Sequence, residues 1–290
     1  MSTRLALYDR VAEETASIVI RRYSTSFGLA SRLLGPSVRQ HVENIYALVR
    51  VADEIVDGPA TEAGLDTVAA GRALNQLETE TEHAMENGFS ANLVVHAFAL
   101  TSREVGFGTD LTAPFFDSMR ADLTQTVHDQ ASFDKYVYGS AEVVGLMCLR
   151  AFLHNEPTYA ATPDDAAELD RGARALGAAF QKVNFLRDLS ADFETLGRSY
   201  FPGVNVDSFT EDDKNRLLDD IDADLAVSAA VVPKLPRSSR RAVALAQGLF
   251  AELAVRLRAT PATELVRARV RVPNPVKARL ALSAAMGGRP

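Results

Sequence analysis

Two pairs of aspartates are the residues of this sequence whose type and spacing are best suited to chemistry. Asp53 and Asp57 close the stretch YALVRVADEIVDG, and Asp188 and Asp192 close the stretch GAAFQKVNFLRDLSAD. Within each pair the residues are four positions apart, so on a helix both carboxylates lie on one face, one turn apart. Because like charges at this spacing destabilise a helix, local stability does not explain either pair.

The neighbours of both pairs are mostly apolar, which indicates that the carboxylates are partly removed from water. A carboxylate in such surroundings must gain a partner or take up a proton. An arginine stands beside each pair, Arg50 before the first and Arg187 within the second. A simple alternative is therefore that these arginines, or a neighbouring helix, neutralise the acids. One such pair is common on solvated helices, but two in similar apolar settings favour a shared function.

Four carboxylates that face one another form a hard oxygen site suited to Mg²⁺, and Mn²⁺ has similar preferences. Mg²⁺ keeps several waters and takes its other ligands from a few carboxylates and from substrate phosphate. A diphosphate bridged in this way loses much of its charge and becomes a leaving group, and Arg50 and Arg187 can hold its oxygens. We therefore expect the four aspartates to be metal ligands rather than general bases.

Composition excludes several other classes of protein. The 290 residues are 47% apolar, enough for a substantial core, and the formal charge of -7 argues against a nucleic-acid partner. Cys148 is the one cysteine, which fits a reducing compartment, and the N-terminus becomes acidic too early for a signal peptide. No P-loop motif is present and the five histidines are scattered. We expect a cytoplasmic protein without a membrane-spanning helix.

The C-terminal part of the chain is the local exception in charge. From residue 256 to 290 there are eight Lys and Arg against one acid, Glu264. A solvated helix face explains such a bias, and a surface for anionic lipid head groups or substrate phosphate is the alternative. The protein would then contact the membrane peripherally.

The elements that must position the aspartates are helices. Apolar residues recur at spacings of three and four, and no convincing strand, linker or repeat interrupts them. We predict helices near residues 4–22, 38–57, 62–87, 91–105, 113–128, 132–153, 163–192, 211–228, 237–258 and 275–286. Short connections favour antiparallel neighbours around one core, so residues 1–290 are expected to form one all-α domain. Acids at the mouth of an apolar helical interior suit the ionisation of an allylic diphosphate away from water.

The two aspartate stretches resemble the two aspartate-rich motifs of the squalene/phytoene synthase family, whose members join two prenyl diphosphates head to head. Further segments agree in order: YSTSF (23–27), MRADL (119–123), FDKYVYGSAEVVG (133–145) and GRSYFP (197–202). The resemblance covers the chain from the first helix to Lys277 and is strongest to bacterial, carotenoid-making phytoene synthases of the actinobacterial kind. It implies an isoprenoid-synthase-type helical bundle with a central active-site cavity.

The resemblance also implies roles for individual residues. The metal ligands would be Asp53, Asp57, Asn184, Asp188 and Asp192. Diphosphate would be oriented by Arg50, Gln181 and Arg187, with Tyr46, Arg198 and Tyr200 close by. Tyr46 and Arg50 would join the aspartates in the catalytic set. A flexible lid over the first prenyl site would contain Ser24, Ser26 and Phe27. The tunnel would be lined by Tyr138, Ala141, Val144 and Gly145.

Two positions depart from the family pattern. Glu142 stands where relatives usually have a small residue, so either it points outward or the cavity differs there. Phe250 stands where an aromatic residue commonly lines the tunnel, and it has no hydroxyl group to which a polar role can be given.

The reaction implied is a metal-dependent condensation of two geranylgeranyl diphosphates to phytoene through a cyclopropyl diphosphate, without NADPH. Dehydrosqualene or squalene synthesis from farnesyl diphosphate is the main alternative, because tunnel depth sets the chain length and the sequence does not reveal it. A terpene cyclase is disfavoured because NFLRDLSAD lacks the N-D-x-x-S-x-x-x-E pattern of that class. An inactive scaffold relative is disfavoured because all four aspartates are present.

Overall fold

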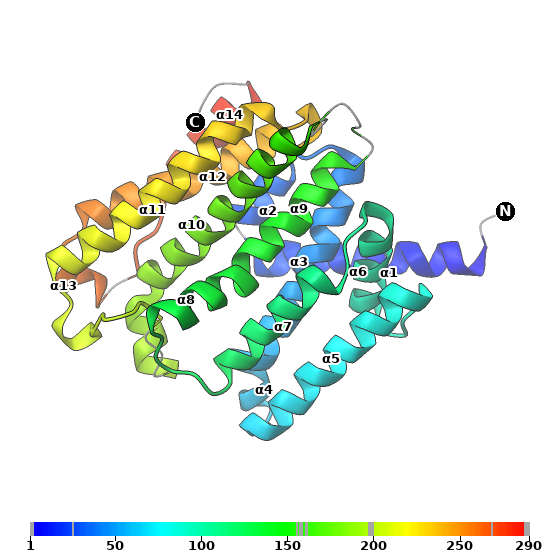
Figure 1. The fold of residues 1–290 in the computed structure, drawn as a ribbon, viewed down its shortest axis with the longest axis horizontal. Helices are drawn as coiled ribbons and strands as arrows, with labels where there is room; N and C mark the ends of the chain where they lie inside the picture. Colours follow the sequence, from blue (N-terminus) through cyan, green and yellow to red (C-terminus); the bar gives the residue numbers. More distant parts are fainter. Residues whose placement is uncertain are drawn as a thin grey trace.

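The computed structural model describes residues 3–24, 26–154, 156, 159, 162–196, 200–267 and 269–286, with the backbone alone for Ser26 and residues 190–196. Every regular element within these residues is helical (Figure 1). The all-α prediction is therefore confirmed.

Ten helices have eleven or more residues among those described: α1 (Arg4–Tyr23), α3 (Pro36–Val56), α5 (Thr67–Asn87), α6 (Leu93–Val105), α7 (Thr109–Asp122), α9 (Val143–Leu153), α10 (Pro163–Leu196), α11 (Glu211–Val231), α12 (Arg237–Ala259) and α14 (Asn274–Ala285). The shorter helices are α2 (Ser26–Ser31), α4 (Pro59–Glu62), α8 (Gln130–Val137) and α13 (Ala262–Leu265). A π-helical turn, η1 (Tyr138–Glu142), joins α8 to α9, and the 3₁₀ turns are η2 (Val206–Ser208) and η3 (Val232–Lys234).

The run α8–η1–α9 passes through the middle of the bundle, and α3, α7 and α10 pack against it (Figure 1). By length and composition alone, its residues Gln130–Leu153 could cross a membrane. Its apolar side chains are instead part of the protein core, where Val143, Met147 and Leu149 are at most 2% exposed. We therefore interpret this segment as a core helix.

Glycines allow α10 to lie very close to the central run. A Cβ atom on Gly145 would lie 2.4 Å from the carbonyl oxygen of Ala173, and one on Gly177 would lie 2.5 Å from that of Ala141. Both distances are far below van der Waals contact. The small residues of these helices therefore serve close backbone packing, which sets the separation of two walls of the cavity described below.

Apart from shifts of a few residues at helix ends and the unpredicted four-residue α13, the predicted helices differ from the structure as follows. The six-residue α2 was not predicted, because so short a segment carries no periodic signal. The predicted helix 62–87 begins only at Thr67, as α5, because the turn around Gly64, whose φ of 91° favours glycine, separates it from the unpredicted α4. The predicted helix 113–128 corresponds to α7, which begins at Thr109, because Pro114 lies inside it, and which ends at Asp122. The predicted helix 132–153 contains the π-helical turn.

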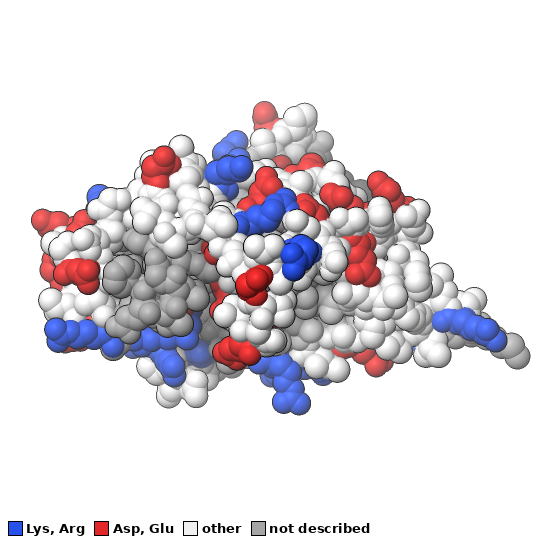
Figure 2. Space-filling model, turned by 90° about the horizontal axis from the view of Figure 1, so that it is seen from below, with Lys and Arg blue, Asp and Glu red and all other residues white. Residues whose placement is uncertain are grey.

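The surface carries charges of both signs. Seen from below in Figure 2, acidic and basic side chains are interspersed over most of the face, and basic ones gather along its lower left edge. This mixed pattern is in keeping with the modest formal charge of -7.

Candidate active site

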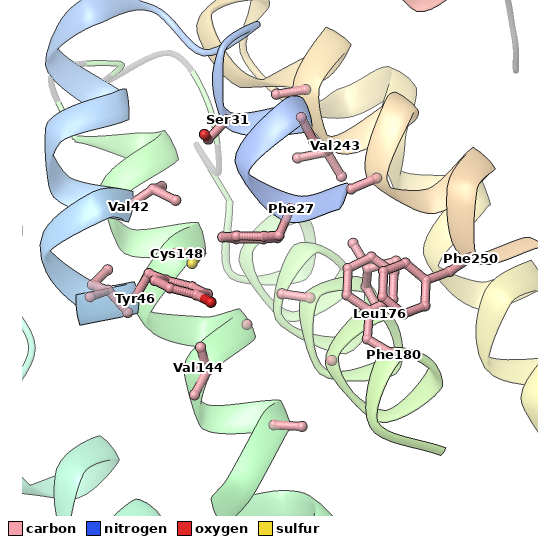
Figure 3. A pocket seen from close by; sticks show the side chains of 18 of the residues that line it. Phe27, Ser31, Val42, Tyr46, Val144, Cys148, Leu176, Phe180, Val243 and Phe250 are labelled. Carbon is pink, nitrogen blue, oxygen red and sulfur yellow. The ribbon is translucent and has the colours of Figure 1, made fainter. Parts of the chain in front are cut away.

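A cavity of about 500 Å³ lies between α2, α3, α9, α10 and α12 (Figure 3). Its polar end is formed by Arg50, Asn184, Arg187 and Arg269. Its other end is apolar and includes Leu149, Phe152, Leu169, Leu235 and Val243. The cavity therefore has the size of a small-molecule site and the polarity of a ligand with a charged head and a greasy tail.

Aromatic side chains cover two sides of the cavity. Phe27 stacks on Tyr46 with ring centroids 5.8 Å apart, and on the opposite side Phe180 stacks on Phe250 at 3.7 Å (Figure 3). The faces of such rings are electron-rich and stabilise a nearby cation. Both pairs also exclude water from the space between them.

Tyr46 is positioned by α3 and by the segment before α2. Burial raises the pKa of its phenol, and its hydroxyl is hydrogen-bonded to Ser24. Both residues line the cavity, as does Phe27. The tyrosine is therefore a neutral hydrogen-bonding group at neutral pH, held in place from the segment predicted to act as a lid.

Arg50 lies one turn after Tyr46 on the same face of α3. One Nη atom is hydrogen-bonded to Glu54, and the guanidinium lies over the ring of Tyr23, 4.6 Å from its centroid. Arg50 therefore pairs with Glu54 rather than with Asp53, and its buried Nε–H group has no partner among the described residues.

The first acidic wall consists of Asp53 and Asp57 at the end of α3, with Asp122 from the end of α7. Burial raises the pKa of Asp53 well above its ordinary value, and the charges of Asp57 and Asp122 raise it further, against the opposing effect of Arg50. The hydroxyl groups of Tyr136 and Tyr200 donate hydrogen bonds to Asp122, at 2.7 and 3.1 Å. Negative charge thus accumulates at this wall.

The second acidic wall is carried by α10. Both Arg187 and Arg269 contact the carboxylate of Asp188: Nε of Arg187 lies 3.0 Å and Nε of Arg269 2.7 Å from Oδ1. Asn184 lies one turn earlier and lines the cavity. An adjacent arginine therefore neutralises Asp188 in this structure, which is the simple alternative considered for both aspartate pairs. This alternative does not apply to Asp53, because Arg50 pairs with Glu54. The side chain of Asp192 lies outside the described residues.

A divalent cation fits this donor set. Burial, and after it the charge of Asp57, raises the pKa of Asp53, and a bound cation would favour the charged carboxylate again. The donors are carboxylate and carboxamide oxygens, which Mg²⁺ prefers. Asp53, Asp57, Asn184 and Asp188 would hold it, and Asp188 would then share or exchange its arginine partners.

Most residues predicted for substrate lie on the cavity. Those that line it are Ser24, Phe27, Tyr46, Arg50, Ala141, Val144, Gly145, Gln181, Asn184 and Arg187. Two predicted residues are placed elsewhere: Tyr138 lies under the guanidinium of Arg174, 5.2 Å from its ring centroid, and Tyr200 is buried against Phe185 and Asp122. Arg198 and the side chain of Ser26 lie outside the described residues.

The two departures from the family pattern have structural explanations. Glu142 is turned toward Arg174, whose Nε lies 2.6 Å from its carboxylate, and it is not among the described residues that line the cavity. Glu142 therefore points away from the cavity, toward α10, although its side chain is only 16% exposed. Phe250 lines the cavity and acts through its ring face alone.

Three residues of the site were missed in the sequence. Arg269 follows α13 and reaches Asp188 from 81 positions away, so no local spacing reveals it. Tyr23 belongs to the YSTSF stretch, from which no contact with Arg50 is predicted, and it lies under the Arg50 guanidinium. Asp122 belongs to MRADL, which was matched without a role. A single acid at the end of an otherwise apolar helix is the signal from which a role for Asp122 could have been predicted.

Comparison with known proteins identifies what the chain is similar to. The family described as squalene/phytoene synthase matches residues 20–275. A phytoene synthase from Pseudescherichia vulneris is 28% identical over 258 residues, covering 81% of this chain and 79% of that protein. Phytoene synthase 3, chloroplastic, from Zea mays is 32% identical over 201 residues, covering 63% of this chain but 41% of that protein.

Solved structures show the same fold. A dehydrosqualene synthase crystallised with a ligand has a TM-score of 0.76 at 21% identity and covers 96% of this chain and 97% of that one. A squalene synthase from Alicyclobacillus acidocaldarius has a TM-score of 0.72 at 19% identity and covers 87% and 95%. The isoprenoid-synthase helical fold predicted from the sequence is therefore confirmed.

Proposed function

The chain belongs to the squalene/phytoene synthase family and is a prenyltransferase, and we propose that it condenses two geranylgeranyl diphosphates head to head to give phytoene. The reaction would pass through a cyclopropyl intermediate that still bears one diphosphate. Two diphosphates and two protons leave in all. The observation that carries the proposal is a single cavity with guanidinium groups at one end and an apolar wall at the other.

The family generally depends on a divalent metal, and we propose that Mg²⁺ is the ion used here. When bound, it neutralises the diphosphate and makes it a better leaving group. The protein's own contribution is to hold the oxygens of the diphosphate. Arg50, Arg187 and Arg269 line the polar end of the cavity, where their guanidinium groups can do so.

The rest of the cavity protects the allylic cation. Phe27, Tyr46, Phe180 and Phe250 line the cavity, where their rings can stabilise the cation and keep water away. No NADPH is needed, because loss of a proton rather than reduction completes phytoene. The preference for the C20 substrate is supported by the names of the relatives, which are phytoene synthases.

A product assay tests the proposal. Purified protein would receive geranylgeranyl or farnesyl diphosphate with Mg²⁺, each with and without NADPH, and the extracted hydrocarbon would be identified by mass. A C40 hydrocarbon with a conjugated triene chromophore is expected from the longer substrate, unchanged by NADPH. A C30 product from farnesyl diphosphate alone would overturn the chain length but keep the reaction class. No hydrocarbon from either substrate would contradict the whole proposal.

Two variants separate the metal site from general damage. Asp188→Ala removes a proposed ligand and should abolish turnover rather than shift its pH optimum. Asp164→Ala changes an exposed residue in the first turn of the same helix and should keep full activity. Turnover by Asp188→Ala at the wild-type rate would contradict the proposed metal site.

We also propose that the basic C-terminal region contacts anionic lipid. Within it Arg256, Arg258 and Arg269 are paired with acids of the protein, so less free charge remains than the sequence indicated. Lys277 and Arg279 on α14 are the basic residues to test. The protein should sediment with vesicles that contain phosphatidylserine at low salt, and it should stay in the supernatant at high salt. Lack of binding at low salt would refute the idea.

A further inference from the structure

A second group of metal-binding side chains lies away from the aspartates. His41 on α3, Glu104 on α6 and His154 at the end of α9 place one ligand atom each within 4.8 Å of one another. On α3, His41 precedes Asp53 by twelve residues, which is about 18 Å along a helix axis. The group is therefore separate from the proposed Mg²⁺ site, and neither the family resemblance nor the proposed reaction uses it.

The distances within the group are close to those of a bound ion. Oε1 of Glu104 lies 3.7 Å from Nε2 of His41 and 3.5 Å from Nε2 of His154. In a tetrahedral site with bonds of about 2.0–2.1 Å, neighbouring ligand atoms are roughly 3.3 Å apart. Each imidazole nitrogen therefore lies within a few tenths of an ångström of this spacing from Glu104, and all three ligand atoms lie within 4.8 Å of one another.

The surroundings hold His41 in the form that binds metal. Its Nδ1 lies 3.1 Å from Oγ1 of Thr101, and Asn44 donates a 3.0 Å hydrogen bond to the same oxygen. When Nδ1 carries the proton and donates it to Thr101, Nε2 keeps its lone pair on the side of Glu104 and His154. Burial lowers the pKa of His41, which favours the neutral, ligating imidazole.

The charge near the group favours a cation. Burial raises the pKa of Glu13, and the charges of Asp9 and Glu104 raise it further, so Glu13 lies within electrostatic range of Glu104. Half of the Glu104 side chain faces solvent, at 56% exposure, which leaves room for water as a further ligand. Two imidazoles with one carboxylate are a ligand set of Zn²⁺ and related ions, unlike the all-oxygen set of the aspartates.

We propose that His41, Glu104 and His154 bind a divalent transition-metal ion such as Zn²⁺, which ties the end of α9 to α3 and α6. Val42 follows His41 directly, and Phe152 lies two residues before His154; both line the apolar end of the substrate cavity. The ion would thereby fix the deep end of that cavity while taking no part in the chemistry at the aspartates.

A cobalt titration tests this site with the full chain. Protein freed of metal by a chelator would be titrated with Co²⁺ in the presence of excess Mg²⁺, and the visible absorption of low-symmetry Co²⁺ would be followed. One equivalent is expected, displaced by Zn²⁺. His154→Gln and Glu104→Gln should lose this band, whereas His83→Gln, an exposed histidine on α5, and Asp53→Asn should keep it.

Thermal unfolding gives a second, independent readout. An ion that binds the folded state alone raises the melting temperature, so Zn²⁺ should stabilise the wild type and not the Glu104→Gln variant. Glu104 is half exposed, so its replacement does not threaten folding. Absence of the cobalt band, or its survival in both His154→Gln and Glu104→Gln, would overturn the proposal.

Discussion

The hydroxyl of Tyr136 on α8 donates a 2.7 Å hydrogen bond to the carboxylate of Asp122 at the end of α7. Both side chains are at least nine-tenths buried. The charge of Asp122 in turn raises the pKa of Asp53, so this hydrogen bond supports an acid that lies next to the proposed metal ligands.

Tyr136→Phe should therefore lower the free energy of unfolding by about 1–3 kcal/mol, because it removes a donor from a buried carboxylate. Tyr200 still donates to Asp122, which favours the lower half of that range. Denaturant unfolding measures the effect. Tyr8→Phe, which removes a hydrogen bond to the partly exposed carbonyl of Ser90, is the control and should change little. Equal losses in the free energy of unfolding for Tyr136→Phe and Tyr8→Phe would show that the hydrogen bond from Tyr136 to Asp122 does not stabilise the fold more than the control bond does.

Asp53→Asn should make the metal-free protein more stable while it abolishes activity. Burial and nearby carboxylates raise the pKa of Asp53 above 3.8, so the folded protein binds this proton more tightly than the unfolded chain. Stability therefore falls as pH rises from about 4 through the raised pKa. The variant has no such loss, so its advantage should grow with pH over that window.

Thermal melts in a chelator between pH 4 and pH 8 measure this advantage. An increase in melting temperature of roughly 2–4 °C is expected at neutral pH, the shift produced by about 1 kcal/mol in a protein of this size. Asp164→Asn, at an exposed site, should show no growing advantage. A variant less stable than the wild type at pH 7 would indicate that the structure already compensates the charge of Asp53.

Local patterns in the sequence were sufficient for the helices and for one side of the site. The spacing of Asp53 and Asp57 predicts a shared helix face, and both lie at the end of α3. Contacts between distant segments could not be predicted in this way. Arg269 reaches Asp188 from a loop, and its position depends on how α13 packs.

The directions of the side chains near the π-helical turn could not be predicted from local sequence patterns either. A π turn contains more residues than an α turn, so it shifts the face on which later side chains lie. Tyr138, predicted to line the tunnel, begins this turn and packs under Arg174, while Ala141 within it lines the cavity. The predicted uninterrupted α-helix over 132–153 would place the side chains of Tyr138 and Ala141 on other faces. The sequence carries no evident signal for the extra residue of the π turn.

Gly145→Ala should destabilise the protein by about 1–3 kcal/mol, the usual cost of overpacking. The added methyl group would lie 2.4 Å from the carbonyl oxygen of Ala173, which belongs to backbone and cannot move alone. Gly71→Ala is the matched control: its methyl group would meet Leu123 at an ordinary 3.6 Å, so this helical site should gain about 0.4–1 kcal/mol. Opposite signs in denaturant unfolding are expected. A neutral Gly145→Ala would mean that α9 and α10 can separate without cost.

Val243→Phe should shift substrate preference toward the shorter chain. Val243 lies on α12 at the apolar end of the cavity, in one cluster with Leu149 and Leu235, so a larger side chain there shortens the space for a prenyl tail. We expect kcat/KM for geranylgeranyl diphosphate to fall at least tenfold relative to that for farnesyl diphosphate, which corresponds to about 1.4 kcal/mol.

The control for this shift is Val255→Phe on the same helix, where the native side chain is 64% exposed. It adds the same volume outside the cavity and should leave the ratio of the two kcat/KM values unchanged. Measurement of both substrates with each variant separates tunnel length from overall activity, since a general loss lowers both values together. An unchanged ratio in Val243→Phe would show that the prenyl tail does not reach α12, and the deep end of the site would then have to lie elsewhere.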